Sequence, residues 1–549
     1  MTSRTVQGQG SAEPGKRRSL LSGHQKRTLK ENLVAFAFLI PALAVVFTFG
    51  IFPIFYAAYV SLYKWRIKQN EWRGLDNYVN AMGDVAYVFF FILALALIIT
   101  GLIVAYRAIK ESRFKGIPLY LSALYLIPGA IIAWGFTLII LKAITFFAQE
   151  EAIAAGEAAR LGNTFLGFLL IVVGIAFSIG IQRFIDKTLH NEGRVLPNFT
   201  LQATAVVLTL ALGFIIARFT YSEMQSSERA AVALVRVRFL FLALIPLVIG
   251  YFIWVWGSRQ QSNLKLALSI LAATVFIAGG VWLATIWPTI SADSDADFYQ
   301  SLTVTIYYSM LTVPVQLGVS MILAYLLYQP LKGRPFFRIV FFIPYIAPAV
   351  ATAGIFDAMF SLRPDSFANS IMVAFGAAPV KWLRESGSAI SVLGQAFGID
   401  AVANWDFGPS LALIVVILFN IWVFVGYDTV IFLAGLGNIP NTLYEAAKID
   451  GAGRWSIFRH ITFPLLSPTT YFLSVISIIG TFKAFNHLYV LRDPAAKGTI
   501  DSASVHFFVT FFRGARFGYS TSMAMVLFVI ILVLYLVQNR IAAKSVHYG

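Results

Sequence analysis

The sequence predicts an all-α, polytopic membrane protein with about 12 transmembrane helices. The first observation is composition, because 58% of the residues are hydrophobic and only 12% are charged, whereas soluble domains carry about 25% charged residues. The second is that apolar stretches long enough to cross a bilayer recur from residue 34 to residue 540. The third is the presence of 49 Phe and 11 Trp, which suit lipid-facing surfaces and interfacial belts.

The basic excess of the chain, a formal net charge of +16, has two interpretations. Nucleic-acid binding is one, but the cytoplasmic loops of a membrane protein give the same excess by the positive-inside rule. We therefore expect no nucleic-acid partner. The absence of cysteine excludes disulfides and cysteine-ligated zinc.

The first 33 residues are polar and basic. Their apolar run starts too late for an ordinary signal peptide. We predict a disordered cytoplasmic tail over residues 1–33, which places the N-terminus inside the cell.

The predicted spans alternate in orientation from an inside N-terminus, and an even number also places the C-terminus in the cytoplasm. The loops around residues 107–115 and 332–338 are basic and are expected inside, whereas the acidic loop 293–297 is expected outside. Two basic outside loops, 64–73 and 229–238, contradict this rule. The spans are placed near 34–61, 87–106, 117–146, 163–182, 201–221, 239–256, 265–287, 301–328, 339–361, 409–435, 468–490 and 522–540.

The polar segment that interrupts the apolar pattern before residue 468 predicts a helix–turn–helix elbow. Thr442 with Glu445 three residues later fits a capping box, so a helix is expected to start near Leu443. Gly451 and Gly453 bracket Ala452, and are expected to stop that helix with a left-handed turn.

A second short helix is expected from about Arg454 to Phe463, with Trp455, Phe458 and Ile461 on one side. Pro464 and Pro468 then suit the first turn of a new helix, where a missing N–H costs little. From periodicity alone, such an elbow could be no more than an interfacial amphipathic linker.

The order of residues in this elbow resembles the EAA loop of ABC-importer permeases. In that family the loop is cytoplasmic and docks into a cleft of the ATP-hydrolysing subunit, so the resemblance implies a coupling role for segment 445–468. The matching positions are Glu445, Ala446, Ala447, Asp450, Gly451, Ala452, Phe458, Ile461, Pro464 and Pro468.

Other stretches are similar to sugar permeases of the maltose-permease F and glycerol-phosphate permease A type. The match covers residues 40–65 and 74–78, and it resumes at 298–302 and continues through the motifs at 333–345 and 432–440. The resemblance implies a type I ABC-importer permease core. It divides the chain into a tail (1–33), a first core span with its loop (34–84), an inserted multi-span segment (85–297) and the main permease domain (298–541).

The inserted segment would hold six spans, an even number that leaves the orientation of the core unchanged. It carries no recognised motif and no clear repeat of the core. A lipid-facing appendage that widens the subunit or helps assembly is one interpretation. A second transport path or a lipid-binding role is the other.

Polar residues inside spans are costly and therefore mark candidate functional positions. The substrate-pathway candidates are Thr352, Asn420, Tyr427, Asp428, Lys483 and Asn486, and Thr305, Gln316 and Asp357 are also noted. Asp428 and Lys483 lie on the two predicted spans that flank the elbow and could form an ion pair. For any single residue the alternative is a structural contact between helices. No metal-ligand spacing or catalytic carboxylate pair stands out.

The resemblance thus implies a permease subunit of an ATP-driven, binding-protein-dependent importer for a sugar or oligosaccharide, in the cell membrane of a prokaryote. It implies no enzymatic activity and no cofactor on this chain, because ATP and Mg would bind a partner ATPase dimer. Further partners would be a second permease subunit, favouring a heterodimer over a homodimer, an extracytoplasmic solute-binding protein and membrane lipid. A secondary transporter, which is expected to show repeated halves, and a lipid-modifying enzyme, which needs a catalytic cluster, remain alternatives.

Overall fold

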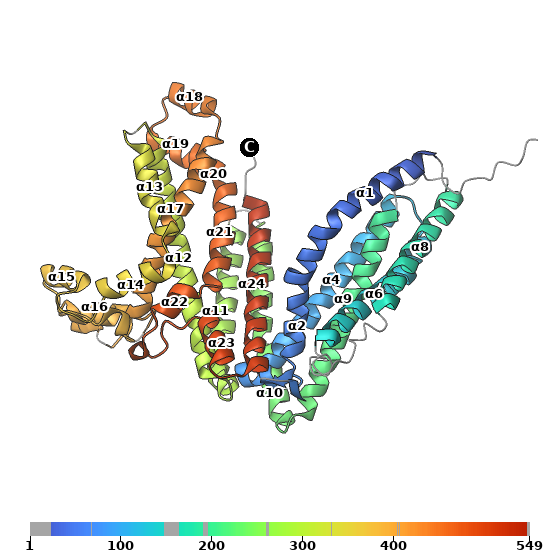
Figure 1. The fold of residues 1–549 in the computed structure, drawn as a ribbon, viewed down its shortest axis with the longest axis horizontal. Helices are drawn as coiled ribbons and strands as arrows, with labels where there is room; N and C mark the ends of the chain where they lie inside the picture. Colours follow the sequence, from blue (N-terminus) through green and yellow to red (C-terminus); the bar gives the residue numbers. More distant parts are fainter. Residues whose placement is uncertain are drawn as a thin grey trace, which may run out of the picture. The chain divides into compact units, whose positions relative to one another are not determined.

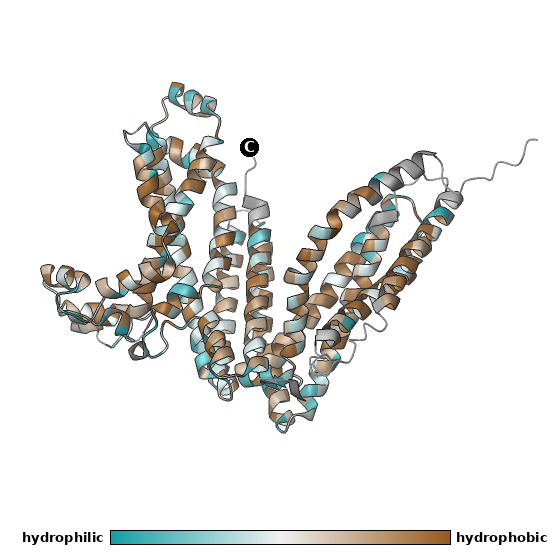
Figure 2. Ribbon diagram, viewed as in Figure 1, coloured by the Kyte–Doolittle hydropathy of each residue, from teal (hydrophilic) through white to brown (hydrophobic). Residues whose placement is uncertain are grey.

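A computed structural model describes residues 23–66, 69–147, 164–189, 196–259, 263–330, 332–402, 404–405 and 407–545. The chain forms two units, Met1–Tyr56 and Ala57–Gly549. Apart from one small hairpin, the regular elements that the structure describes are helices (Figure 1). Hydrophobic residues run along the long helices, whereas the short helix α18 is hydrophilic along much of its length (Figure 2).

The first unit contains α1 (Gly23–Val46), the π-helical turn η1 (Phe47–Ile51) and the start of α2 (Phe52–Val60). The tail was predicted to be disordered through residue 33, and this boundary is wrong because α1 begins at Gly23. Residues 25–31 are rich in Lys, Arg, Gln, Leu and Glu, which favour helix and extend α1 beyond its apolar part. Residues 1–22 of the predicted tail lie outside the described residues.

The second unit holds the remaining elements. Its N-terminal part contains β1 (Tyr63–Trp65), β2 (Gln69–Trp72), α3 (Asp76–Met82), α4 (Val85–Phe114), α5 (Leu119–Ala123), α6 (Leu126–Phe147), α8 (Thr164–Leu189), α9 (Leu196–Ser226), α10 (Ala230–Gly257) and α11 (Asn263–Ser291).

Its C-terminal part contains α12 (Ala296–Tyr328), α13 (Arg334–Ile346), α14 (Ala349–Met359), α15 (Phe367–Ala374), η2 (Trp382–Arg384), α16 (Ala389–Ala396), η3 (Asp400–Val402), α17 (Leu411–Gly437), α18 (Asn441–Ile449), α19 (Arg454–Ile457), η4 (Phe458–Thr462), α20 (Phe463–Leu465), α21 (Ser467–Phe482), α22 (Asn486–Val490), η5 (Pro494–Ala496), α23 (Ala503–Phe512) and α24 (Phe517–Ser545).

The described residues include 11 helices that are long and apolar enough to cross a membrane, or up to 12 when the pair α13 and α14 counts as one span. This confirms the predicted all-α fold with about 12 spans. The pair is bent by 95° at Ala347 and Pro348, where Ala347 adopts an extended backbone. A residue before proline is biased away from the α conformation, which explains the break.

The long helices α12 and α17 pack along each other, with α13 against α17 and α21 against α12. Gly426 in α17 lies so close to the backbone carbonyl of Phe341 in α13 that any side chain at this position would clash with it. Glycine here lets two backbones approach, as is common at helix contacts in membranes.

The helices of the predicted insert pack mainly with one another. α4 lies along α9, α6 contacts both α8 and α9, and α10 pairs with α11. A buried hydrogen bond from the Tyr125 hydroxyl to Gln182 Oε1 (2.8 Å) links the start of α6 to α8. α3 contacts α4 as well as α12 and α24, so it joins this group of helices to the core.

Segment 229–238, which was predicted as a loop and contradicted the charge rule, lies almost entirely in α10. Two of its three arginines form ion pairs with carboxylates. Arg236 Nη1 lies 2.8 Å from Asp84 and 2.9 Å from Asp293, and Arg229 lies 2.9 Å from the other oxygen of Asp293. The hydrogen bonds from Arg236 and Arg229 lower the pKa of Asp293. A cation that is neutralised in an ion pair contradicts the positive-inside rule less than a free cation would.

The segment between α14 and α17 folds into a cap around the buried side chain of Asn369 in α15. Asn369 Nδ2 donates to the carbonyls of Arg363 (3.0 Å) and Val380 (3.2 Å). Its Oδ1 accepts from the Val380 amide (3.0 Å) and from Trp382 Nε1 (2.8 Å). One amide side chain thus connects α15, the following loop and η2.

Replacing Asn369 with Ala is expected to open this cap while the spans stay folded. The substitution leaves several buried donors and acceptors without partners, at a cost of about 1–3 kcal/mol each. Limited proteolysis should then cut within residues 361–408 at least tenfold faster than in the parent protein. Ser370→Ala, at the exposed neighbouring position, is the control and should leave the rate unchanged; equal rates for both variants would contradict the role of Asn369.

Candidate functional site

The elbow begins with α18, which starts at Asn441 rather than near Leu443. The predicted capping box is wrong, because Pro440 occupies the N-cap position and no side chain caps the helix. Pro440 has an extended backbone, and its carbonyl accepts from the Leu443 amide at 3.2 Å. Thr442 and Glu445 therefore lie inside the helix.

The predicted left-handed stop at Gly451 is confirmed, with a φ of +76°. The Gly451 amide donates to the carbonyl of Lys448 (3.1 Å), and the Ala452 amide donates to that of Ala447 (2.9 Å). These two bonds form a Schellman motif, in which glycine is favoured because a Cβ is disfavoured at positive φ. Gly453 has an extended backbone and is the N-cap of α19.

The second helix of the elbow was predicted as one run from about Arg454 to Phe463. The structure divides it into α19, the π-helical turn η4 and α20, so its regularity was overestimated. Pro464 lies in the first turn of α20 and Pro468 in the first turn of α21, as predicted. The rings of Trp455 and Phe458 stack with centroids 5.6 Å apart, and Phe458 also contacts Tyr325 of α12.

Much of the elbow surface is exposed. α18 has no buried residue, and Ile449 and Trp455 are 86% and 71% exposed. Tyr444 attaches α18 to the core, where its hydroxyl lies 3.3 Å from Thr462 Oγ1 and burial raises its pKa. Isolated helices of this length are marginal in water, and exposed apolar residues indicate an interaction surface.

The structure brings the predicted coupling residues together on this elbow. Glu445, Ala446, Asp450 and Gly451 are exposed, whereas Ala447, Ala452, Phe458, Ile461, Pro464 and Pro468 are half-buried. The exposed set clusters on α18 and its Schellman turn, and the half-buried set lies mainly where the elbow meets the spans. A partner protein could therefore contact the exposed residues without displacing the half-buried ones.

A cavity of about 410 Å³ lies among α12, α13, α17, α21 and α22. Asn420, Tyr427, Asp428, Lys483 and Asn486, which were predicted from sequence as pathway candidates, all line it. Thr352 does not line it; it lies on α14, and its hydroxyl donates to carbonyls of its own helix turn.

Two further polar positions noted in the sequence also lie elsewhere. Thr305 links α12 to α23 by accepting from the Ala503 amide at 2.9 Å, so it serves as a contact between helices. Asp357 lies 3.9 Å from Arg384 at the cap.

A buried chain of three polar side chains forms one wall of the cavity. Asn420 Nδ2 donates to Gln316 Oε1 (3.0 Å), and Gln316 Nε2 donates to Asp428 Oδ2 (2.6 Å). Asp428 and Lys483, which could have paired, form no ion pair within 4.0 Å. Gln316 therefore orients both neighbours, and the amine of Lys483 stays available to the cavity.

Aromatic side chains line the same cavity. The rings of Tyr345 and Tyr427 stack with centroids 4.5 Å apart, and Phe424 meets Tyr345 edge-on at 5.6 Å. Phe485 lines the cavity from the segment between α21 and α22. The cavity thus combines ring faces with hydrogen-bonding groups, which is typical of sites that bind small polar molecules.

Lys483 lies where the helix that begins at Ser467 breaks. α21 ends at Phe482, and α22 starts at Asn486 after three residues that are not helical. Irregular backbone at membrane depth is tolerated where it lines a cavity, and broken helices often mark binding sites in transporters.

Sequence reasoning missed Tyr345, Ser477, Thr481 and His487 as lining residues. Ser477 and Thr481 are one helical turn apart on α21, a signal that becomes useful only when the inward face is known. His487 neighbours the predicted Asn486, and its Nε2 lies 2.6 Å from the Tyr308 hydroxyl. Tyr345 stood within a recognised motif but carried no assigned role.

Comparison with known proteins identifies the core. The family described as "Binding-protein-dependent transport system inner membrane component" matches residues 305–546. The arabinooligosaccharides transport system permease protein AraP of Bacillus subtilis (strain 168) is 31% identical over 258 residues, covering 46% of this chain and 74% of that protein.

Another curated relative agrees with this match. The sn-glycerol-3-phosphate transport system permease protein UgpA of Agrobacterium fabrum is 29% identical, covering 47% of this chain and 79% of its own length. A bacterial transporter of the acidic polysaccharide alginate matches at a TM-score of 0.39 with 23% identity, covering 46% of this chain and 80% of that one. Because it is 31% identical to AraP over 74% of that protein, the chain belongs to the family of binding-protein-dependent transport system inner membrane components, and it is an ABC-importer permease rather than an enzyme.

Proposed function

We propose that this permease carries a sugar or oligosaccharide across the cell membrane of a prokaryote. The observation that carries the substrate class is the cavity, because stacked tyrosines suit sugar rings and the Asn420–Gln316–Asp428 chain suits hydroxyl groups. Two relatives are named as permease proteins of arabinooligosaccharide and lactose transport systems, which agrees with that chemistry.

The elbow would couple transport to ATP hydrolysis on a separate ATPase dimer in the cytoplasm, which would hold ATP and Mg. The exposed surface of α18 and its Schellman turn supports this role, because short rigid helices transmit a displacement that a loose loop would absorb. The ten predicted coupling residues supply that surface and its attachment to the spans.

A complete importer would need further components. A second permease subunit would form a heterodimer with this chain, and an extracytoplasmic binding protein would deliver the solute. Both termini would be cytoplasmic. Residues 34–84 and 298–541 would form the permease core, whereas the insert 85–297 would be a lipid-facing appendage that widens the subunit.

A pull-down of the tagged chain from mild detergent, followed by mass spectrometry, tests the assembly. We expect an ATPase subunit and a second permease among the recovered proteins. Uptake of labelled oligosaccharides into proteoliposomes of that complex then tests the substrate class. A chain that purifies without any ATPase at every salt and detergent condition would contradict the proposal.

A further inference from the structure

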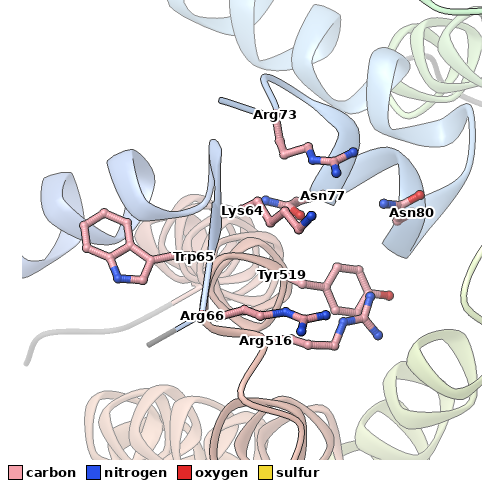
Figure 3. Close-up of a pocket in the computed structure, with 8 residues that line it drawn as sticks. All are labelled: Lys64, Trp65, Arg66, Arg73, Asn77, Asn80, Arg516 and Tyr519. Atoms are coloured by element: carbon pink, nitrogen blue, oxygen red, sulfur yellow. The ribbon is translucent and has the colours of Figure 1, made fainter. Parts of the chain in front are cut away.

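A second pocket, of about 180 Å³, lies at the N-terminal end of α24, beside the β1–β2 hairpin and α3. Within the second unit this end of α24 lies opposite the elbow (Figure 1), on the side expected to face the cell exterior. Four cationic side chains line it, those of Lys64, Arg66, Arg73 and Arg516. Figure 3 shows them on one side of the hairpin together with Tyr519, whereas the ring of Trp65 points away.

The charges of this pocket are poorly balanced. Arg73 lies 3.2 Å from Glu71 and 3.7 Å from Asp76. Within the part of the chain that the structure describes, Lys64, Arg66 and Arg516 have no carboxylate within ion-pair distance. Arg516 lies over the ring of Tyr519 at 4.1 Å.

Arg516 also borders a neighbouring pocket, which is lined by Asp295, Asp297 and Asp501. Asp295 Oδ2 accepts the Tyr519 hydroxyl at 2.6 Å, and no carboxylate lines the cationic pocket itself. Three cations without an ion-pair partner therefore line one pocket, which favours an anion there.

The backbone that carries these cations is held in place. Asn77 Nδ2 donates to the carbonyls of Ser61 (2.8 Å) and Tyr63 (2.9 Å), which anchors the hairpin to α3. The Ser522 hydroxyl in α24 donates to the Asn77 carbonyl at 3.3 Å. Gly518 allows α24 to approach the carbonyl of Tyr63 so closely that a Cβ would clash. The backbone segments that carry these cations are therefore held in fixed positions around the pocket.

The pocket also lies beside the ends of two candidate membrane spans. Lys64 follows the span that ends at Val60, and Arg516 immediately precedes the span that begins at Phe517. The hairpin carries an aromatic cluster in which Tyr63 meets Trp65 and Trp72 edge-on. Tyr and Trp concentrate at the level of lipid headgroups, so the same segment combines interfacial aromatics with uncompensated cations.

We propose that this pocket binds the phosphate-bearing headgroup of an anionic phospholipid in the outer leaflet. Its volume is many times the roughly 10–15 Å³ that one water needs, so it can admit a phosphate group. Arg binds phosphate through paired N–H donors and Lys binds it as a point charge. This explains why loop 64–73 keeps basic residues on a side where they are normally scarce. The proposal does not depend on the transported solute.

The test compares the purified chain in nanodiscs of phosphatidylcholine with nanodiscs that also contain phosphatidylglycerol. We expect phosphatidylglycerol to raise the unfolding temperature of the parent protein and to be retained in native mass spectrometry. The triple variant Lys64→Gln, Arg66→Gln, Arg516→Gln should lose that stabilisation and bind the lipid at least tenfold more weakly. Arg363→Gln, an exposed arginine of the cap outside this pocket, is the matched control and should behave as the parent.

The change in unfolding temperature without phosphatidylglycerol distinguishes lipid binding from a merely structural role of these residues. Because the variant removes like-charge repulsion, its unfolding temperature in pure phosphatidylcholine should equal or exceed that of the parent. If the triple variant does not fold, the single variant Arg516→Gln provides the same comparison. Equal stabilisation of parent and variant by phosphatidylglycerol would overturn the proposal.

Two further measurements identify the occupant. Soluble glycerol 3-phosphate and inorganic phosphate should compete with the lipid only weakly; if either binds as tightly, the site takes a free anion and the lipid assignment is wrong. Loss of affinity for an acidic binding protein in the variant, with lipid binding unchanged, would also overturn it.

Discussion

Replacing Gly451 with Asp is expected to abolish ATP-driven uptake while the transmembrane fold stays intact. Gly451 holds the Schellman turn at a φ of +76°, where a residue with a Cβ costs about 1–2 kcal/mol. The turn is exposed and no neighbouring atom lies within 4 Å of the position that a Cβ would occupy, so the strain should distort the elbow rather than the spans. We expect at least a tenfold loss of ATPase association and a corresponding loss of uptake.

The matched control for this prediction is Gly453→Asp, two residues away. It adds the same charge, and the space around it is equally open, but Gly453 has a φ of −70° that any residue adopts. Asp is also a favourable N-cap for α19. Co-purification of the ATPase and proteoliposome uptake should therefore change little. If both variants lose coupling equally, charge rather than the left-handed turn is responsible.

The elbow shows which parts of a helix boundary the sequence can predict. The stop at Gly451 was predictable because positive φ strongly favours glycine and the two glycines stand close together. The start was misplaced because Thr442 and Glu445 satisfy the capping-box spacing, yet Pro440 already provides the extended N-cap conformation two residues earlier. The π-helical turn of η4 was not predicted from the sequence; in the structure its first residue, Phe458, packs against Tyr325 of α12, 133 positions earlier in the chain.

The cavity shows a different limit of prediction from the sequence. Buried polar residues in spans are visible in a sequence because they are costly, and five of the six candidates do line the cavity. Which face of each helix points inward depends on packing between helices that are far apart in the chain. Thus the sequence suggested Lys483, across the elbow, as an ion-pair partner that Asp428 could have, but its partner Gln316 lies on α12, 112 residues earlier.

Replacing Gln316 with Leu is expected to reduce both stability and uptake, because Gln316 is the middle member of the buried polar chain. The change roughly keeps the side-chain volume but removes the acceptor of Asn420 and the donor to Asp428. Each buried group left without a partner costs about 1–3 kcal/mol, so a loss of about 2 kcal/mol or more in unfolding free energy is expected. Uptake should fall at least tenfold, because Asn420 and Asp428 then lose their fixed orientation in the cavity.

Gln300→Leu tests whether this effect belongs to the chain of hydrogen bonds. Gln300 lies on the same helix, but it is exposed, and its side chain donates to the Lys497 carbonyl at 3.2 Å rather than to a buried side chain. Thermal unfolding and uptake of this variant should match the parent protein. A double-mutant cycle of Gln316→Leu with Asn420→Leu should show strong coupling, because the second change removes the donor that the first leaves unpaired. Additive effects would mean that the two amides act independently, and that the cavity wall is not organised by Gln316.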